Sequence, residues 1–174
     1  IRDESDRIYP TNTIQMYFTS NHDENSWNGA DYKTFPGAVH APFAVFSQTM
    51  AKSVPLIYGG QEEPVLRPLK FFDKDPMVFG KFERAAFYKT LLLLRQRNVA
   101  LSADASFRKV SVGDDRSVYA FVREKSGKKV LVILNFSGKP QSVAIKEKSL
   151  SGQAFNVFKS AKERLSNKAW ELAP

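Results

Sequence analysis

Two short apolar segments, each followed at once by polar residues, constrain the fold of this chain most strongly. Apolar and polar residues alternate over 14–19, which predicts a strand, and an Asn-His-Asp sequence follows it at 21–23. A continuous apolar run at 54–58 is typical of a strand buried on both faces of a parallel sheet, and Gly-Gly-Gln-Glu-Glu follows it at 59–63. Parallel strands end at the same edge of a sheet, so both polar segments are expected to line one site.

Helical patterns separate and follow these two segments. Residues 39–52 carry apolar side chains at helical spacing, so residues 14–58 form a predicted strand–helix–strand unit. Three prolines make residues 64–79 irregular. A second helix is predicted over 81–97, with basic residues in its last turn that suit the helix dipole. Its expected apolar stripe contains Ala86, Phe87, Leu91 and Leu94.

The pattern changes after residue 101. Short β-type runs alternate with turn sequences such as Ser126-Gly127, and these hairpin-length spacings predict an antiparallel sandwich. Two domains are therefore expected, over residues 1–100 and 101–174. The predicted strands of the second domain are 107–112, 117–123, 129–136, 141–145 and 154–158.

Composition excludes several classes of site and partner. The chain has no cysteine, which excludes disulfides and thiolate metal sites, and no apolar run reaches the roughly 18 residues of a membrane span. Its net charge of +8 divides into −3 over residues 1–75 (seven Lys/Arg, ten Asp/Glu) and +11 over residues 76–174 (nineteen Lys/Arg, eight Asp/Glu). Because the basic residues are scattered, we expect them to lie solvated on outer β faces and expect no nucleic-acid partner. Binding of a phosphate backbone or an acidic surface is the alternative.

The Asn-His-Asp sequence has several interpretations when it is taken alone. It could be a polar turn with no chemistry, since Asn and Asp favour turns. A His-Asp pair could orient a nucleophile, but the chain has neither a Gly-x-Ser-x-Gly sequence nor a cysteine. A metal site would need more ligands, and the other histidine, His40, lies far along the chain at the start of a predicted helix.

Four segments in chain order resemble the α-amylase family of glycoside hydrolases. Residues 18–23 (Phe-Thr-Ser-Asn-His-Asp) resemble the family's last conserved block, at the end of the seventh barrel strand, and residues 55–62 resemble the eighth strand with its loop. Residues 68–76 resemble the segment that follows, and residues 87–101 resemble the final barrel helix. The β segment resembles the family's C-terminal sandwich domain, notably over 130–137.

This resemblance implies a fold of class α/β plus all-β. The chain would hold the last two strand–helix units of a (β/α)8 barrel, followed by an antiparallel β-sandwich. It also implies a retaining glycoside hydrolase that acts on α-1,4-glucans such as starch and maltooligosaccharides. By the same match Asp23 would stabilise the transition state, and His22 and Asn21 would bind the sugar at the cleavage point.

The departure from the family concerns the two catalytic carboxylates. The family's nucleophile and acid/base blocks precede the Asn-His-Asp block, and this sequence holds no match to either. We therefore expect the chain to be a C-terminal fragment that is inactive by itself. Residues 1–98 are expected to need the missing barrel segment or other copies of the chain to stay ordered. No cofactor is evident, and any calcium of the complete enzyme would be bound by residues outside this chain.

Other residues near the strand ends receive smaller roles. Trp27 could stack on a glucose ring or pack its own loop, and Tyr58 could line the subsite or fill the barrel core. Gln61 and Glu62 are expected to shape the site by holding backbone amides, with substrate contact as the alternative. Arg67 is expected to pair with a carboxylate from an absent strand. Phe71 and Phe72 are expected to be structural, closing the last loop of the barrel.

Rival functions remain at this point. The sandwich could serve a carbohydrate-binding or interaction module, although it lacks the pair of tryptophans that would form a sugar platform. A catalytically dead homologue acting as a scaffold is another possibility. Within the family, a transglycosylase or branching enzyme is the alternative to a hydrolase.

Overall fold

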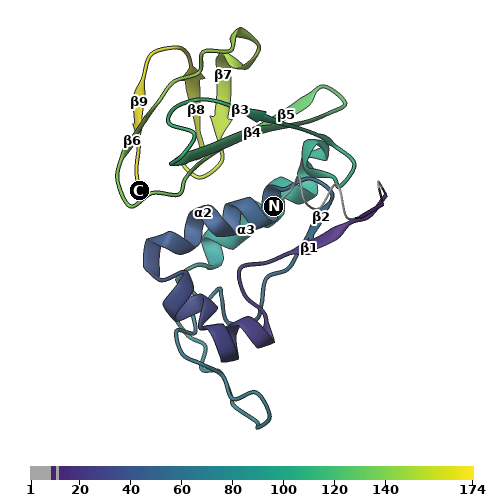
Figure 1. The fold of residues 1–174 in the computed structure, drawn as a ribbon, viewed down its shortest axis with the longest axis vertical. Coiled ribbons are helices and arrows are strands. Elements are labelled where there is room, and N and C mark those ends of the chain that lie inside the picture. The colour runs from purple at the N-terminus through teal and green to yellow at the C-terminus, as the bar shows by residue number, and fades with distance from the viewer. Residues whose placement is uncertain (1–8, 11) are drawn as a thin grey trace.

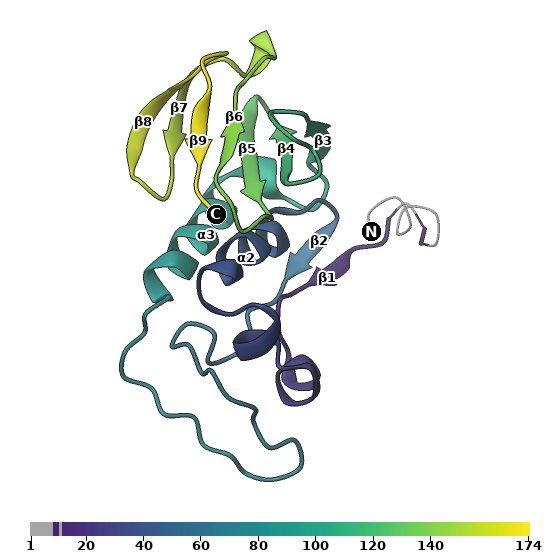
Figure 2. The same cartoon turned by 60° about the vertical axis from the view of Figure 1, so that its left-hand side comes forward.

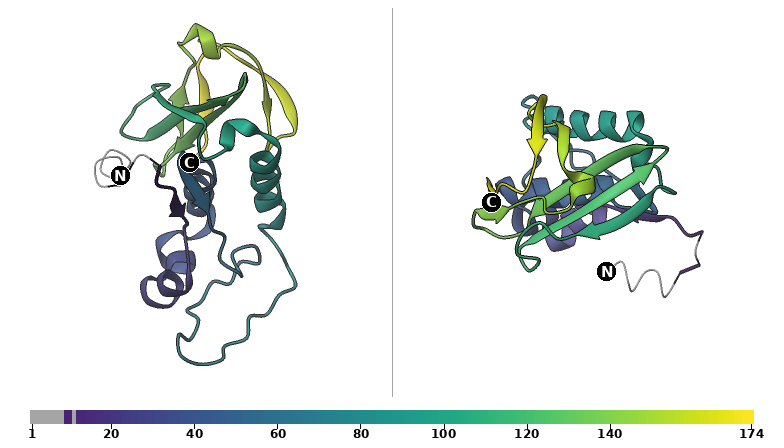
Figure 3. Two further views of the ribbon diagram at one scale, coloured as in Figure 1. Left: turned by 90° about the vertical axis from the view of Figure 1, so that its right-hand side faces the viewer. Right: turned by 90° about the horizontal axis from the view of Figure 1, so that it is seen from above.

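The computed structural model describes residues 9–10 and 12–174, which form three stacked parts. Figure 1 shows a pair of helices, α2 and α3, in the middle of the molecule, with a group of β-strands on one side of them. A short parallel strand pair and a set of loops lie on the other side. Figure 3 shows the loops extending to the end of the molecule that is remote from the β-strands.

The predicted strand–helix–strand unit is present. β1 (Gln15–Tyr17) and β2 (Ser53–Pro55) pair in parallel, with Met16 opposite Val54, and α2 (His40–Thr49) lies between them in the sequence. Both strands are three residues long, shorter than predicted, and Val54 is 50% exposed rather than buried on both faces. The (β/α)8 barrel to which such a unit could belong remains a proposal.

The segment between β1 and α2 consists of three short helical turns. Two single π-type turns, η1 (Glu24–Asn28) and η2 (Ala30–Thr34), precede a short 3-10 turn, η3 (Gly37–Val39). Gly29 joins the first two turns in the left-handed region, at φ +68°, where a Cβ atom would lie 2.9 Å from the Cβ of Lys33. This position therefore requires glycine.

Residues 56–84 contain neither helix nor strand, and α3 (Ala85–Arg97) follows them. The helix starts four residues later than predicted, because the Glu63 carboxylate accepts hydrogen bonds from the backbone amides of residues 80–82 and holds them outside the helix. Tyr88 and Leu91 are its buried residues, whereas Ala86 of the predicted stripe is exposed. A 3-10 turn, η4 (Val99–Leu101), completes the connection to the β region.

The β region contains antiparallel pairs that fit a β-sandwich. One sheet has the order β3-β4-β5, and two further pairs are β6 with β9 and β7 with β8. A two-residue turn at Ser126-Gly127 joins β4 to β5, as predicted, with Lys125 opposite Lys128. The strands are β3 (Ser106–Val110), β4 (Val118–Lys125), β5 (Lys128–Asn135), β6 (Gln141–Val143), β7 (Gly152–Asn156), β8 (Ala161–Leu165) and β9 (Trp170–Leu172), with a 3-10 turn, η5 (Lys148–Leu150), before β7.

Both faces of β4 are covered. On one face Val118, Ala120 and Val122 pack in a cluster that includes Val143 and Ile145. On the other face Phe121 packs with Met50, Val132 and Leu134, and Val45 and Phe46 of α2 lie against this second cluster. Figure 2 shows the resulting arrangement, in which the strands lie over the helix pair.

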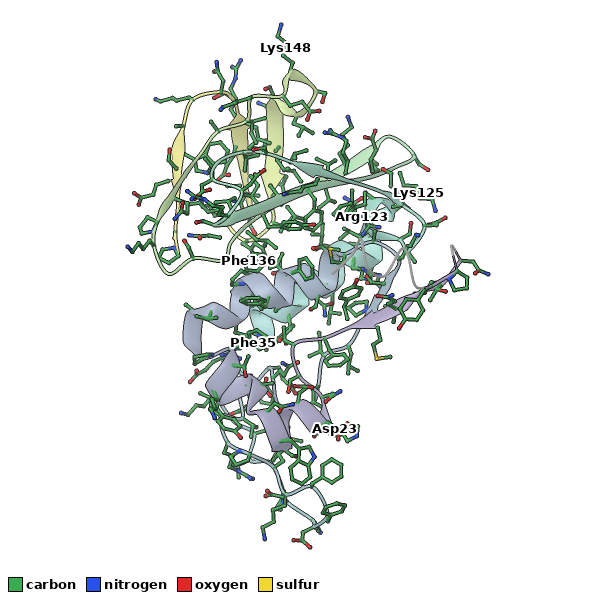
Figure 4. All side chains as sticks on the ribbon, in the orientation of Figure 1. Asp23, Phe35, Arg123, Lys125, Phe136 and Lys148 are labelled. Atoms are coloured by element: carbon green, nitrogen blue, oxygen red, sulfur yellow. The ribbon has the colours of Figure 1, made fainter. Side chains whose placement is uncertain are left out.

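A buried arginine joins the β region to the helices. Arg123 of β4 is 0% exposed, and its guanidinium donates hydrogen bonds to the backbone oxygens of Thr49 (2.7 Å), Ser102 (2.7 Å) and Ser106 (3.0 Å). Thr49 is the last residue of α2, so a cation lies at the negative end of that helix. Figure 4 shows Arg123 at the junction between helices and sheet.

Candidate functional site

The Asn-His-Asp sequence lies in solvent beyond the end of β1. The side chains of His22 and Asp23 are 67% and 53% exposed, and the nearest imidazole nitrogen and carboxylate oxygen are 3.5 Å apart. Asn21 stabilises the turn that follows, because its side-chain oxygen accepts a hydrogen bond from the Glu24 amide at 2.8 Å. Figure 4 shows Asp23 at the end of the molecule away from the β region. The carboxylate and the imidazole are therefore open to a ligand.

A buried carboxylate that the sequence did not indicate lies behind this pair. Asp31 is 3% exposed, and one of its oxygens accepts a hydrogen bond from Ser20 Oγ at 2.6 Å. The other oxygen accepts from Gln61 Nε2 at 2.8 Å. Since Ser20 directly precedes Asn21, this network fixes the backbone from which the exposed side chains project. No local pattern marks Asp31, since Ser20 lies before η1 and Gln61 lies beyond β2.

Gln61 connects the ends of the two strands. Its amide nitrogen also donates to Thr19 Oγ1 at 2.9 Å, and its oxygen accepts from the Tyr58 amide at 3.0 Å. Glu62 accepts from the Gly60 amide at 2.9 Å. Gln61 therefore connects the segment after β2 to Thr19, at the end of the first predicted strand, and the side chains of Gln61 and Glu62 both hold backbone amides. Tyr58 is partly exposed, and its proposed contact with substrate remains a prediction.

A ring cluster borders the exposed pair. The His22 imidazole stacks on Phe71, and their ring centroids are 5.7 Å apart. The ring centroids of Trp27 and Phe71 are 5.2 Å apart. Trp27 is nevertheless 62% exposed, so its loop does not bury it. Phe72 is 86% exposed, which shows that the expected structural packing was wrong for this residue.

Arg67 corrects a second expectation. Its guanidinium forms a bidentate salt bridge with Asp75 of its own loop, and both nitrogen–oxygen distances are 2.7 Å. The hydrogen bonds from Arg67 lower the pKa of Asp75 to about 2. The partner is thus eight residues along the chain and does not come from another strand.

His40 is buried between α2 and α3, away from the exposed His22–Asp23 pair. It is 2% exposed, and its Nε2 contacts the hydroxyl of Tyr88, which connects the start of α2 to α3. Burial lowers the pKa of His40 to about 4, with Arg84 acting in the same direction and Asp31 opposing it. Burial also raises the pKa of the Tyr88 hydroxyl. Both groups are therefore neutral at pH 7.

The glutamates near the site are occupied by other contacts. Glu24 accepts from Asn28 Nδ2 at 3.0 Å, and Glu63 accepts from the amides of Lys81 and Gly80, which lower the pKa of its carboxyl. Within residues 9–10 and 12–174, no group of three or more His, Asp or Glu side chains is placed to hold a metal ion. No helix in this part of the chain is long and apolar enough to cross a membrane.

The β region matches a known family in sequence. Residues 118–174 match the family model described as the α-amylase SusG C-terminal domain. No protein of curated function matches this chain in sequence.

Solved structures match the fold over almost the whole chain. An α-amylase from Lactobacillus plantarum superposes with a TM-score of 0.75 at 19% identity, covering 99% of this chain and 39% of the other. The maltogenic α-amylase AmyB from Thermotoga neapolitana gives 0.76 at 18% identity, covering 97% and 41%. A variant of the trehalulose synthase MutB gives 0.67 at 18% identity, covering 99% and 44%. This chain thus spans about two fifths of the length of these structures. In sequence over residues 118–174, and in fold over nearly its full length, the chain corresponds to the C-terminal portion of α-amylase family proteins.

Proposed function

We propose that this chain supplies the last part of the active site of a retaining glycoside hydrolase that acts on α-1,4-glucans. The observation that supports the proposal most strongly is the exposed His22–Asp23 pair at the end of a parallel strand, fixed from behind by buried hydrogen bonds. In this proposal β1 and β2 are the seventh and eighth strands of a (β/α)8 barrel. Their free edges would pair with neighbouring barrel strands.

Asp23 would act on the sugar at the cleavage point. A carboxylate can accept hydrogen bonds from two sugar hydroxyls, and these bonds strengthen as positive charge develops on the ring. His22 would hydrogen-bond a hydroxyl of the same sugar. Asn21 would act through the turn that it stabilises, because its side-chain oxygen is already engaged by the Glu24 amide.

The nucleophile and the acid/base would come from other segments of the barrel. A general acid of this class needs a carboxyl whose pKa is raised, whereas backbone amides lower the pKa of Glu63. Glu24 and Glu62 are also engaged, by Asn28 and by the Gly60 amide. We therefore propose that the chain alone does not hydrolyse glucans. Incubation with maltoheptaose and analysis of reducing ends would test this, and turnover above buffer would contradict it.

Substitution of Asp23 in an enzyme that contains the complete barrel tests the main proposal. Asp23→Asn should lower kcat on maltooligosaccharides by at least about a hundredfold, the usual consequence of losing a transition-state contact. Glu24→Gln is the matched control, because it changes the adjacent carboxylate, which contacts Asn28. An unchanged rate for a correctly folded Asp23→Asn enzyme would defeat the role of Asp23.

Transfer of the glycosyl group to another sugar is the alternative outcome within the family. The fold does not separate hydrolysis from transfer, since α-amylases and a trehalulose synthase both share it. Analysis of the products formed from maltotriose distinguishes them, because hydrolysis yields shorter sugars only and transfer also yields longer or isomeric ones.

A further inference from the structure

An exposed group of aromatic rings adjoins the His22–Asp23 pair. Phe71 is at its centre, with ring centroids 5.7 Å from His22, 5.2 Å from Trp27 and 4.8 Å from Phe72. Trp27 is 62% exposed and Phe72 is 86% exposed. Large apolar groups gathered on a surface mark binding sites more often than isolated ones do. We refer to Trp27, Phe71 and Phe72 as the aromatic platform.

The platform is held in place from below by polar contacts. Ser26 Oγ donates to the Leu69 carbonyl and the Leu69 amide donates to Asn25 Oδ1, each at 2.9 Å, so the two residues of η1 that precede Trp27 are connected to the long loop. In the same loop Asp75 accepts from Arg67 and from the Lys70 amide. These bonds order the backbone that carries the rings without burying the rings, so less of the loop has to be ordered when a ligand binds.

The chemistry beside the platform indicates what would bind there. A pyranose ring has an apolar face of C–H bonds, which packs on an aromatic ring, and a rim of hydroxyls, which needs hydrogen-bonding partners. His22 supplies both types of contact, because its ring stacks on Phe71 while its Nε2 lies 3.5 Å from the Asp23 carboxylate. A purely apolar partner would leave this carboxylate desolvated and unpaired.

We propose that the aromatic platform is a subsite for a second sugar ring, adjoining the ring that His22 and Asp23 bind. This inference rests on the function proposed above, and it names the side chains that would bind the sugar ring next to the one at the cleavage point. Binding strength should therefore rise with the number of rings. Glucose occupies only the position at the His22–Asp23 pair, whereas maltotriose also reaches the platform.

Tryptophan fluorescence of the full 174-residue chain measures this binding directly. The chain has two tryptophans, so Trp170→Phe leaves Trp27 as the only indole reporter. We expect maltotriose to change the Trp27 emission in a saturable manner, with a lower Kd than that of glucose. If Trp170→Phe does not fold, the indole N–H resonance of Trp27 in the natural chain serves as the reporter.

Phe72→Ala tests the platform, and its exposure makes unfolding an unexpected result. Loss of one aromatic contact should weaken maltotriose binding about threefold to tenfold and leave glucose binding unchanged. Phe155→Ala, which removes a 60% exposed phenylalanine of β7, is the matched control and should change neither. Equal Kd values for maltotriose and glucose, or an unchanged maltotriose Kd in Phe72→Ala, would overturn the subsite.

The two proposals fail in different ways. If His22→Ala abolishes maltotriose binding and Phe72→Ala does not weaken it, the platform is wrong while the function proposed above stands. If Phe72→Ala weakens binding and Asp23→Asn leaves the rate of the complete enzyme unchanged, the platform stands and the catalytic role of Asp23 is wrong.

Discussion

The region that carries the site and the β region are stabilised by different interactions. β1 and β2 are three residues long and, among the residues that the structure describes, pair only with each other. β4, by contrast, is eight residues long and has a partner on each side. Met16 and Val54 are 59% and 50% exposed, whereas Val118 and Val122 are 2% and 3% exposed. The long strands and apolar core thus belong to the part that has no proposed chemistry.

Most of the buried polar groups lie outside the β region, which nevertheless contains Arg123 and Asn135. Ser20, Asp31, Gln61 and His40 are each at most 3% exposed, and each takes part in a hydrogen bond. Such a network depends on geometry and protonation, while an apolar core depends on volume. The difference predicts that the site region responds to pH and to single polar substitutions, and the β region to changes of side-chain size.

The largest effect is expected at the junction of the two regions. Arg123→Met keeps the volume of the side chain but leaves the backbone oxygens of Thr49, Ser102 and Ser106 without this donor. We expect the free energy of unfolding to fall by about 3–5 kcal/mol, measured by urea denaturation. Arg116→Met, at a side chain that is 90% exposed, is the control and should change stability by less than about 0.5 kcal/mol. If the free energy of unfolding fell by a similar amount in the two variants, the site region and the β region would be stabilised independently of each other.

Acid should destabilise the site region through His40. The folded protein holds this histidine neutral with a pKa of about 4, whereas the unfolded chain binds a proton below about pH 6.5. Stability is therefore retained above pH 6.5 and lost as the pH falls toward 4, by up to about 3 kcal/mol.

Unfolding midpoints between pH 7.5 and 4.5 would measure this loss. His40→Gln should flatten the slope, whereas His22→Gln, at the exposed histidine, should keep it. An equal slope in the natural chain and in His40→Gln would assign the pH dependence to other groups.

A pair of valine truncations compares the two regions directly. Val122→Ala creates a cavity in the β-region core and should lower the free energy of unfolding by about 2 kcal/mol. Val54→Ala removes methyl groups from a half-exposed strand and should cost less than about 0.5 kcal/mol. Urea midpoints measure both. A larger effect at Val54 would mean that β2 is covered in solution, as the expected barrel or self-association requires.

The smallest effect is local and concerns the long loop. Glu63→Gln removes the charge that accepts from the amides of Gly80, Lys81 and Phe82, so these amides should exchange with solvent roughly tenfold faster. The same amides should lose protection in acid. Because these hydrogen bonds lower the pKa of Glu63, its carboxylate stabilises the loop fully above the ordinary glutamate pKa, and this stabilisation is lost as the pH falls and the carboxyl is protonated. Glu83→Gln is the control, since that carboxylate lies 3.9 Å from Lys81 Nζ in solvent.

Local patterns predicted the elements that depend on neighbours in the sequence. The parallel pair at the ends of 14–58, the helix within 81–97 and the Ser126-Gly127 hairpin were all predicted from periodicity and turn residues. The hydrogen bond between Gln61 and Thr19 agrees with two parallel strands that end at the same sheet edge. β8 was missed because Lys162, Glu163 and Arg164 give it the polarity of a loop.

Long-range partners were beyond the sequence. Asp31 is buried because Gln61, 30 residues away, reaches it, and no spacing rule connects them. Arg123 alternates with apolar residues in β4 as a solvent-facing residue would, yet it is covered by α2, 74 residues earlier in the chain. Arg67 was assigned a distant partner and has a near one. Asp31 and Arg123 thus have partners that tertiary packing brought to them, whereas the partner of Arg67 lies in its own loop.

Arg123 also limits where this protein could be cut and recombined. A graft that begins at residue 106 would carry the guanidinium with the Ser106 oxygen but without those of Thr49, Ser102 and Ala105. Moving the boundary back to residue 99 would restore two of the three, and only the end of α2 supplies the third. Exchange of C-terminal domains between relatives of this protein should therefore succeed when the donor helix end travels with the sheet.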